Sequence, residues 1–560
     1  MIGNSIIEGR RLTGANFFCD EPAAILELNL EPEKFEAFYL HWQNAIRTLH
    51  DLLDRPQPQF FHRRHAKGQS LIVTAPIDAL YSTIELLEAV FTLFDELGYN
   101  ERLEAKQLRL IADQFRDIYK QEQRPDIIHL RDQALEHKVP FLWDDDFLSL
   151  GYGKCSDTWP IDELPNKPNW ETYRAIPLAI ITGTNGKSTT TRLCSQILKH
   201  GDMTVGFSST DGIWAGEDCL DTGDYSGPGG AREVLRNKKI DVAILEVARG
   251  GLLRRGLGAE NANVALITNV AEDHLGEWGI NTLDELIEAK FIVRKAVKSK
   301  GYLILNADDQ GCVNFAQNLD QTISWFSLNR NNPLIQQQIK NKSTAFFADE
   351  GQLFAAFNGE VQAYCNIKDI PISFNGAALH NISNALSASS LTYHLGVKLD
   401  TIRKGLCSFN GNEQNPGRGN IFNRQGVSIM VDFAHNPHGL NAVVNTLLQL
   451  PAKRRLVMLG HAGDRSNGDI DALTQSALKL NPDQIVIYEI ADYLRGRELG
   501  EIPEIIRQSL KERGYPLDQV IFAESSVDGT KKALAWSEHG DFLLLLALSD
   551  REAVFALLKE

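Results

Sequence analysis

Short apolar runs alternate with helical patterns in the first part of the chain. The runs "AAILELNL" (23–30) and "SLIVTAP" (70–76) favour strands, whereas "EKFEAFYLHWQNAIRTLHDLL" (33–53) and "ALYSTIELLEAVFTLFDEL" (79–97) favour helices. The stretch that follows residue 155 is rich in Pro, Trp and polar residues, which is typical of a linker. The pattern therefore predicts an N-terminal α/β domain over residues 1–155 and a linker over 156–175.

From residue 176 the order becomes buried strand, glycine turn and helix. The apolar runs of this kind are "IPLAIIT" (176–182), "DVAILEVA" (241–248), "NVALITNV" (263–270) and "GYLILNADD" (301–309). Strands that alternate with helices favour a doubly wound parallel sheet whose ligand lies at the carboxyl ends of the strands. We expect this central domain to span residues 176–410.

The same alternation of apolar strands and helices continues to the end of the chain. The later runs are "SIMVDFAHNP" (428–437), "RRLVMLGHAGD" (454–464), "DQIVIYEIAD" (483–492) and "DFLLLLALSD" (541–550). Pro416, Gly417 and Gly419 come just before them and mark a boundary. The sequence thus predicts a second, Rossmann-like α/β domain over residues 411–560.

Composition and charge argue against several classes of binding partner. The chain has 560 residues and a formal net charge of −16, which argues against non-specific binding to nucleic acid or to an anionic membrane surface. The seven cysteines are scattered without a CxxC pair, and the first fifteen residues lack the apolar core of a signal peptide. We expect a cytoplasmic protein with reduced thiols, no membrane span and no nucleic-acid partner.

The segment "AIITGTNGKSTTTRLC" (179–194) resembles a phosphate-binding turn. Its Gly-Lys-Ser matches the end of a Walker A sequence, but Ile181 occupies the position of the first Walker glycine. Glycines allow close backbone approach, and a helix that begins near Lys187 would direct N–H groups at phosphates. The predicted nucleotide-binding residues of this turn are Gly183, Thr184, Asn185, Gly186, Lys187, Ser188 and Thr189. The alternative is a strand-to-helix turn without a ligand.

Acidic and histidine side chains follow the neighbouring strands. Glu246 closes one strand, and "TNVAEDHLGEWG" (268–279) delivers Asn269, Asp273 and His274 after the next. Carboxylate and imidazole groups at this edge suit Mg²⁺ beside a γ-phosphate. The alternatives are a capped strand end for Glu246 and a loop histidine for His274.

A helix further along, "LDELIEAKFIVRKAV" (283–297), carries Lys290. Taken alone, this lysine reads better as a solvated side chain on the helix surface than as a functional group.

Taken together, the chain resembles the Mur ligase family of ATP-dependent amide-bond ligases. Six segments carry the resemblance: "TGTNGKST" (182–189), "TNVAEDHLG" (268–276), "EAK" (288–290), "LHNISNALSA" (379–388), "NPGRGN" (415–420) and "VDFAHNPHG" (431–439). The resemblance implies that Asn269, Asn381, Arg418 and Asp432 contact the nucleotide. It also implies that Lys290 becomes carbamylated and supports a second Mg²⁺.

Within that family, the chain is more similar to the ligase half of the cyanophycin synthetases than to the cell-wall ligases. The segments "EVARGGLLRRGLG" (246–258) and "GHAGDRSNGDI" (460–470) carry this likeness, and the opening residues resemble the N-terminal domain of those enzymes. The chain departs from them in having only a linker where they carry an ATP-grasp domain. The resemblance therefore implies one ligase site, and not the whole two-site activity.

The implied reaction transfers the γ-phosphate of ATP to a carboxylate and joins the acyl phosphate to an amine. Lys187, Glu246, His274 and Lys290 are its predicted catalytic residues, and Ser188, Glu246 and His274 its predicted metal ligands. The expected cofactors are ATP and Mg²⁺. The expected partners are an amino acid and a carboxylate-bearing amino acid or peptide acceptor, and a homo-oligomer is compatible with the family.

Four residues are weaker candidates for substrate contacts. Arg249 and Arg254 could grip a carboxylate with a bidentate guanidinium, and Asp464 and Arg465 could grip the incoming amino acid. The structural alternatives are a solvated basic turn and a salt bridge. For "FFHRRHAKG" (60–68), a basic surface turn is a better interpretation than a metal site.

Two other functions stay open at this stage. One is a folylpolyglutamate-type ligase. The other is a nucleotide-binding partner subunit without catalysis, which the presence of every expected catalytic side chain disfavours.

Overall fold

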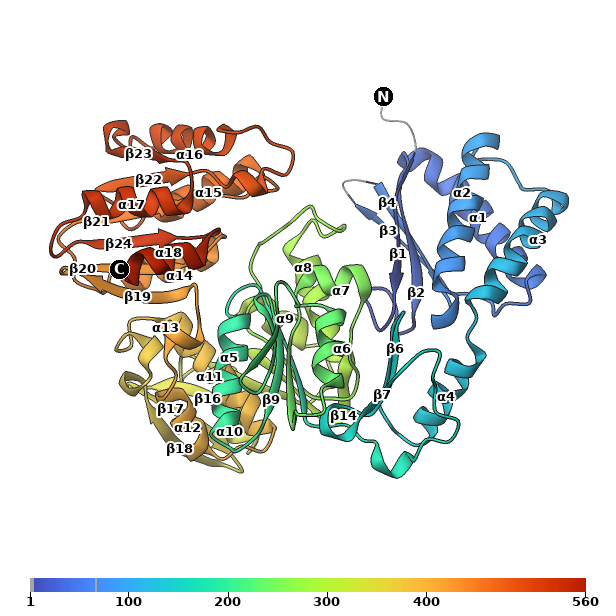
Figure 1. The fold of residues 1–560 in the computed structure, drawn as a ribbon, viewed down its shortest axis with the longest axis horizontal. Helices are drawn as coiled ribbons and strands as arrows, with labels where there is room; N and C mark the ends of the chain where they lie inside the picture. Colours follow the sequence, from blue (N-terminus) through green and yellow to red (C-terminus); the bar gives the residue numbers. More distant parts are fainter. Residues whose placement is uncertain (1–4, 66–67, 560) are drawn as a thin grey trace. The chain divides into compact units, whose positions relative to one another are not determined.

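The computed structural model describes residues 5–65 and 68–559 and divides into two compact units that interleave along the chain (Figure 1). The first unit contains the chain up to Gly183 together with Asp202–Leu305 and Asp309–Ile323. The second contains Thr184–Gly201, Asn306–Asp308 and Ser324–Glu560. The phosphate turn predicted from the sequence therefore straddles the division.

The first unit opens with a four-stranded antiparallel sheet in the order β1-β2-β4-β3. Its elements are β1 (Ser5–Leu12), β2 (Ala23–Asn29), β3 (Phe60–His65), β4 (Gly68–Thr74), α1 (Pro32–Leu52), α2 (Leu80–Leu97) and α3 (Ala105–Glu122). On β2, Leu26 and Leu28 pack with Phe38 and Trp42 in one core, while Ile25 faces a second cluster on the other side. The N-terminal sheet is thus buried on both faces.

The segment at 60–68 is not a surface turn. Residues 60–65 form β3 and pair with β4, and residues 66 and 67 lie outside the described residues. His65 reaches the Glu27 carboxylate at 3.0 Å, although the two residues are 38 positions apart. The interpretation from sequence was wrong because it searched for an acidic partner only nearby in the chain.

A small subdomain follows. It consists of α4 (Pro125–Glu136) and a three-stranded antiparallel sheet of β5 (Phe141–Trp143), β6 (Phe147–Leu150) and β7 (Asp157–Pro160). The stretch expected to be a linker, 156–175, therefore begins with an ordered strand. Trp159 and Trp170 from this stretch pack against the subdomain core.

The first unit also holds the strands around the expected ligand edge. Their order is β11-β10-β9-β12-β8-β13-β14. The strands β9, β12, β8, β13 and β14 are parallel to one another, whereas β10 pairs antiparallel with both β9 and β11. The strands are β8 (Leu178–Thr182), β9 (Val205–Ser209), β10 (Gly212–Ala215), β11 (Asp218–Thr222), β12 (Val242–Glu246), β13 (Ala262–Ile267) and β14 (Val297–Asn306). The helices are α6 (Pro228–Arg236), α7 (Arg249–Arg255), α8 (Leu283–Phe291) and α9 (Gln310–Ala316). The parallel core agrees with the doubly wound prediction.

The second unit contains α5 (Lys187–Lys199) and the strands β15 to β18 in sequence order, with a division at the first residue of β15. These elements are β15 (Ile323–Ser327), β16 (Ala345–Asp349), β17 (Gln352–Phe357), β18 (Glu360–Asn366), α10 (Pro333–Lys340), α11 (Leu379–His394), α12 (Leu399–Cys407) and α13 (Gly411–Gln414). β17 pairs antiparallel with both β16 and β18, which the alternation of strands and helices in the sequence did not predict.

The C-terminal part of the second unit has the Rossmann-like form expected from the sequence. Its sheet order is β19-β20-β24-β21-β22-β23, and only β19 runs antiparallel to its neighbour. The strands are β19 (Arg418–Arg424), β20 (Val427–Asp432), β21 (Arg455–Leu459), β22 (Gln484–Tyr488), β23 (Val520–Ala523) and β24 (Phe542–Leu546). The helices α14 (Pro437–Leu447), α15 (Asn467–Leu478), α16 (Glu501–Glu512), α17 (Ser526–Trp536) and α18 (Arg551–Lys559) complete it. Separate apolar clusters on the two sheet faces show that helices cover both sides.

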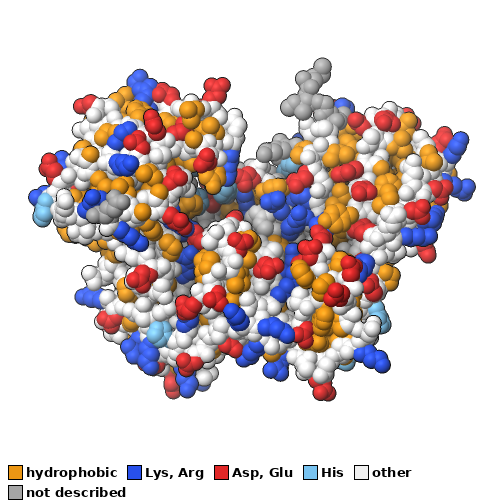
Figure 2. Space-filling view, viewed as in Figure 1, with side chains coloured by type: hydrophobic (Ala, Val, Ile, Leu, Met, Phe, Trp, Pro, Cys, Tyr) orange, Lys and Arg blue, Asp and Glu red, His pale blue; other side chains and the backbone are white. Residues whose placement is uncertain are grey.

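On the face drawn in Figure 2, acidic and basic side chains are interspersed. Among the described residues, no helix combines the length and the apolar character that crossing a bilayer requires.

Candidate functional site

The turn after β8 depends on glycine at Gly183. All five residues of β8 are buried, and Gly183 then takes φ +147°. A Cβ at this position would collide with the side chain of Thr268, which follows the neighbouring strand β13. Glycine therefore lets the backbone turn close against the carboxyl end of the next strand.

The turn continues into α5 in the second unit. Gly186 caps the helix in a left-handed conformation with φ +86°, and a Cβ there would collide with Asn384 of α11. Lys187 donates a hydrogen bond from Nζ to the Thr184 carbonyl at 3.0 Å, which folds the ammonium back over the turn. The first turn of a helix presents N–H groups and a positive dipole end, so this turn has the features that favour phosphate.

In the first unit, Glu246 and Lys290 belong to elements beside β8. Glu246 is the last residue of β12, pairs in register with Ile181, and is only 1% exposed. Lys290 of α8 is 4% exposed, and its Nζ donates to the Gly183 carbonyl at 2.8 Å. The sequence alternative of a solvated surface lysine is therefore wrong.

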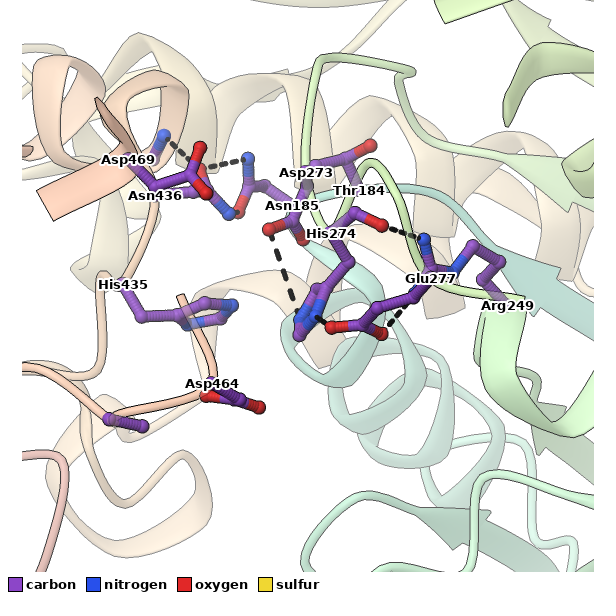
Figure 3. Close-up of polar contacts among 12 residues, drawn as sticks. Thr184, Asn185, Arg249, Asp273, His274, Glu277, His435, Asn436, Asp464 and Asp469 are labelled. Carbon is purple, nitrogen blue, oxygen red and sulfur yellow. Dashed lines mark hydrogen bonds and ion pairs between the residues drawn. The ribbon is translucent and has the colours of Figure 1, made fainter. Parts of the chain in front are cut away.

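His274 lies in the loop after β13 and is held by a chain of polar contacts (Figure 3). Its Nδ1 lies 2.9 Å from Glu277 Oε1, and Glu277 Oε2 accepts from the Arg249 guanidinium at 2.6 Å. Arg249 also donates to the carbonyl oxygen of His274. A carboxylate at Nδ1 favours a proton there, which leaves Nε2 as the nitrogen suited to a ligand.

Two further expected residues lie near this loop. Asn269 follows β13, and a Cβ at Gly183 would lie 3.2 Å from its carbonyl oxygen. The Asp273 carboxylate lies 3.9 Å from His274 Nε2. The structure thus gathers Gly183, Asn269, His274 and Lys290 around the carboxyl ends of β8 and β13.

In the second unit, Asn185 of the turn meets the start of α14 (Figure 3). Its Nδ2 lies 3.2 Å from Asn436 Oδ1 and 3.0 Å from His438 Nδ1. Asn436 is the N-cap of α14, with Oδ1 accepting from the Gly439 amide at 2.8 Å. The turn and the C-terminal domain are therefore linked through Asn185.

The helix α11 presents two asparagines to the same region. Asn384 Nδ2 donates to Asn381 Oδ1 at 3.2 Å, and Asn381 Nδ2 donates to the Ile372 carbonyl at 2.9 Å. Both side chains are buried. Both polar atoms of the Asn381 side chain, which is expected to contact the nucleotide, are thus engaged by neighbouring residues.

Asp432 ends β20 opposite Arg418 of β19. Burial raises the pKa of the Asp432 carboxyl to about 6, although Arg418 and backbone amides pull it down. The Arg418 guanidinium lies 4.6 Å from the centre of the Phe433 ring. A carboxylate that titrates close to neutral pH is an acceptor whose strength depends on pH.

The four residues expected to contact substrate differ in their burial and in their contacts with other protein residues. Arg249 is buried and committed to the His274 loop, as described above. Arg254 is exposed at the end of α7, with its guanidinium 5.3 Å from the Trp278 ring centre. Asp464 pairs with Arg495, and Arg465 is 8% exposed.

Sequence reasoning missed four polar residues of this region, namely Glu277, Asn384, Asn436 and His438. Two of them had a usable signal in their spacing. Glu277 follows His274 by three residues, and Asn384 follows Asn381 by three on one helix face. Asn436 and His438 had no such signal, because their partner Asn185 is 251 or more positions away.

Two segments of the chain match family models of known protein domains. Residues 181–392 match the family model described as "Mur ligase middle domain". Residues 417–547 match the model described as "Mur ligase, glutamate ligase domain".

Curated relatives are similar over about two thirds of the chain or less. A protein of Geminocystis herdmanii named "Cyanophycin synthetase" is 38% identical over 337 residues, which are 60% of this chain and 38% of that protein. The chain thus spans under half the length of that relative. A protein of Listeria monocytogenes named "UDP-N-acetylmuramoyl-L-alanyl-D-glutamate--2,6-diaminopimelate ligase" is 24% identical, covering 66% of this chain and 73% of the relative.

A solved structure supports the fold. A bifunctional folylpolyglutamate synthase/dihydrofolate synthase, solved with Mn, AMPPNP and L-glutamate bound, is 18% identical with a TM-score of 0.51. The similarity covers 69% of this chain and 90% of that one. At this identity the likeness concerns the arrangement of the chain alone.

Proposed function

We propose that this chain, which belongs to the Mur ligase family, is an ATP-dependent ligase that joins a carboxylate to the amine of an amino acid. The observation that carries the proposal is the buried Lys290 amine at the backbone of a glycine-dependent phosphate turn. A lysine is seldom buried without a function or a partner, and here it reaches the turn that would hold the γ-phosphate.

In the proposed reaction, the acceptor carboxylate attacks the γ-phosphorus of ATP, and ADP leaves. The amine then attacks the acyl phosphate carbon, forms the amide and releases phosphate. Two anions meet in the first step, so positive charge must lie at the transferring group. Lys187 and the first N–H groups of α5 supply part of this charge.

The side chains present fit Mg²⁺. In the first unit, Glu246 offers a buried carboxylate and His274 an imidazole whose other nitrogen is engaged by Glu277. The Ser188 hydroxyl stays a ligand expected from the sequence alone. When bound, the cation neutralises phosphate oxygens and polarises the γ-phosphoryl group. Glu246 and His274 thus serve by binding and orientation, and Lys187 serves by charge.

Substrate recognition is assigned residue by residue. Arg254 is the better candidate for an acceptor carboxylate, because Arg249 would have to release Glu277 first. Asp464 and Arg465 are candidates for the incoming amino acid. Asn381, Arg418 and Asp432 are the candidates for the adenosine part of ATP.

The acceptor belongs to a chemical class and not to one compound. The relative from G. herdmanii is named a cyanophycin synthetase, which favours an aspartate side chain or an aspartate-containing peptide as acceptor. Because the chain spans only 38% of that relative, we assign to it a single ligation step and not polymer synthesis.

The test is ADP formation by the purified chain with Mg²⁺ and ATP across a matrix of substrates. Aspartate, β-aspartyl-arginine, short aspartate-arginine peptides and glutamate-bearing peptides are each crossed with the twenty amino acids. Mass spectrometry then identifies products heavier by one residue, and Lys187→Ala is the matched control.

ADP together with a longer product supports the ligase and names both substrates. Activity confined to glutamate on a pterin-containing acceptor, added as a separate arm, would favour the folylpolyglutamate type instead. Nucleotide binding without any product across the matrix would contradict the proposal and favour a partner subunit.

A further inference from the structure

The face of the N-terminal sheet opposite α1 and α2 carries a buried polar cluster. The Glu27 carboxylate of β2 accepts hydrogen bonds from Arg10 of β1 and from Ser70 of β4, the latter at 2.7 Å. His65 of β3 lies 3.0 Å from the same carboxylate. All four strands therefore contribute to one network, in which the pKa of Glu27 is held below its usual value although burial opposes this.

This cluster is tied to α7. Arg10 is 5% exposed and donates from its guanidinium to the Leu253 carbonyl at 2.8 Å. The chain after β1 adds two backbone hydrogen bonds, from Thr13 N to the Arg255 carbonyl at 2.9 Å and from Leu257 N to the Ala15 carbonyl at 2.8 Å. α7 is the helix that begins at Arg249.

The same face contacts the His274 loop. The Trp278 ring has the Arg10 guanidinium 4.8 Å from its centre and the Arg254 guanidinium 5.3 Å from it. A Cβ at Gly279 would lie 3.4 Å from the His65 side chain, so the loop runs directly against β3. Trp278 is four residues from His274 and adjacent to Glu277, the partner of its imidazole.

The third contact reaches α8. Arg63 of β3 pairs with Glu285 at 2.7 Å, and Glu285 closes the capping box at the start of this helix. Lys295, on the 3-10 helix Ile292–Ala296 that follows α8, pairs with Asp20 at 2.8 Å. The helix that carries Lys290 is thus held at its start by the N-terminal domain, which also holds the segment after it.

We propose that the N-terminal sheet is a positioning scaffold for the ligase site, acting through Arg10, Arg63 and Trp278. These contacts fix the three segments that carry Arg249, His274 and Lys290. The inference rests on the proposed function of those residues, and it assigns the N-terminal domain a role in the chemistry of the central domain. The plain alternative is that the sheet only packs against these segments and stabilises the fold.

The experiment compares Trp278→Leu and Arg63→Gln with Arg131→Gln. Arg131 pairs with the exposed Asp132 on α4 and serves as a matched control for loss of a surface ion pair. Trp278→Phe keeps an aromatic face for the two guanidinium groups and tests rescue. Thermal unfolding of each variant identifies any that fail to fold.

Three readouts separate positioning from packing. They are kcat against KM for ATP, the Mg²⁺ concentration for half-maximal turnover, and amide hydrogen exchange in 273–280 and 283–291. Supporting groups around a metal site change affinity or activity by about 10- to 100-fold when removed. We expect a kcat about 10-fold lower, a higher Mg²⁺ requirement and faster exchange in Trp278→Leu and Arg63→Gln, with recovery in Trp278→Phe.

A further measurement does not depend on turnover. Calorimetric titration of AMPPNP with and without Mg²⁺ should show weaker binding in Trp278→Leu only when Mg²⁺ is present. If the wild-type chain forms no product, the proposed function fails, while this titration and the exchange data still decide the inference. Variants that match Arg131→Gln in Mg²⁺ response and exchange would overturn it.

Discussion

The Lys290 ammonium group donates a 2.8 Å hydrogen bond to the carbonyl oxygen of Gly183. This contact joins α8 to the backbone of the phosphate turn, across 107 positions of sequence. It also buries a positive charge, which is costly unless polar partners or function compensate for it. Lys290 is therefore placed where a change in its charge would alter the environment of the turn.

Replacement of Lys290 by alanine should lower kcat by about 100-fold, since a group at the transferring phosphate is lost. If the lysine acts as a carbamate, formate or acetate should restore part of the rate by supplying a carboxylate in the vacated space. The measurement is ADP release with and without each anion, and Lys290→Arg is the control that keeps the charge. A wild-type rate in Lys290→Ala would assign the side chain to packing alone.

Replacement of Lys187 by alanine should reduce turnover by about 100- to 1000-fold, because its ammonium no longer offsets the charge on the γ-phosphoryl group. The effect should fall on kcat more than on folding, since the Lys187 side chain makes a hydrogen bond at the turn surface and not in a core. Coupled ADP detection and a thermal melt measure the two. Undiminished turnover would remove this segment from the proposed nucleotide site.

Binding of nucleotide should weaken as the pH falls through about 6, the pKa to which burial raises the Asp432 carboxyl. The proposed ribose contact needs the ionised form, so ADP affinity should rise with pH and level off above pH 7. Asp432→Asn should bind about 10-fold more weakly and lose this dependence. Calorimetry from pH 5 to 8 gives both results, and an identical pH profile in wild type and variant would contradict the assignment.

The Asp432 carboxyl should affect folding stability in the opposite direction, because its contribution to stability falls as the pH rises. Its folded pKa lies above the unfolded value of 3.8, so its contribution to stability is present below pH 3.8 and is lost as pH rises to about 6. Asp432→Asn should therefore gain stability relative to wild type with rising pH, by at most about 3 kcal/mol. Denaturant unfolding at pH 4.5 and 7.5 measures the difference, and a constant offset at both values would mean that the pKa is not raised.

Local patterns predicted the elements that bury apolar runs. β8, β12 and β24 lie inside the expected runs, and β13 begins one residue before its run, because a parallel strand is covered on both faces and has a continuous apolar sequence. β3 was not predicted because four of its six residues are His or Arg, and the β16–β18 hairpins were not predicted because their antiparallel pairing does not follow the strand-and-helix alternation. Such strands are defined by their pairing as much as by their composition.

In the candidate site, too, the features that depend on local sequence were predicted and those that depend on distant residues were not. Gly183, Gly186 and Lys187 were predicted because they are contiguous and the chemistry of a phosphate turn is local. The burial of Lys290 and the engagement of Arg249 could not be predicted, because each depends on a residue far away in the chain. Residue type and spacing therefore indicated a candidate chemistry, while the partners of each group could be identified only from the fold.

Arg249 provides the last prediction, because it contacts both Glu277 and the backbone of His274. Arg249→Gln and Glu277→Gln should each lower kcat about 10-fold by loosening the His274 imidazole, and the double variant should lose little more. If Arg249 instead grips a substrate carboxylate, its loss should raise the KM of the acceptor and add fully to the loss at Glu277.

A double-mutant cycle in kcat and in acceptor KM distinguishes these cases. Arg255→Gln is the matched control, since it lies on the same helix and is exposed. Coupling above about 1 kcal/mol in kcat supports Arg249 as a positioning residue, because residues that share one partner network are not additive. Full additivity with a raised KM would assign the guanidinium to substrate and require the Glu277 contact to open during turnover.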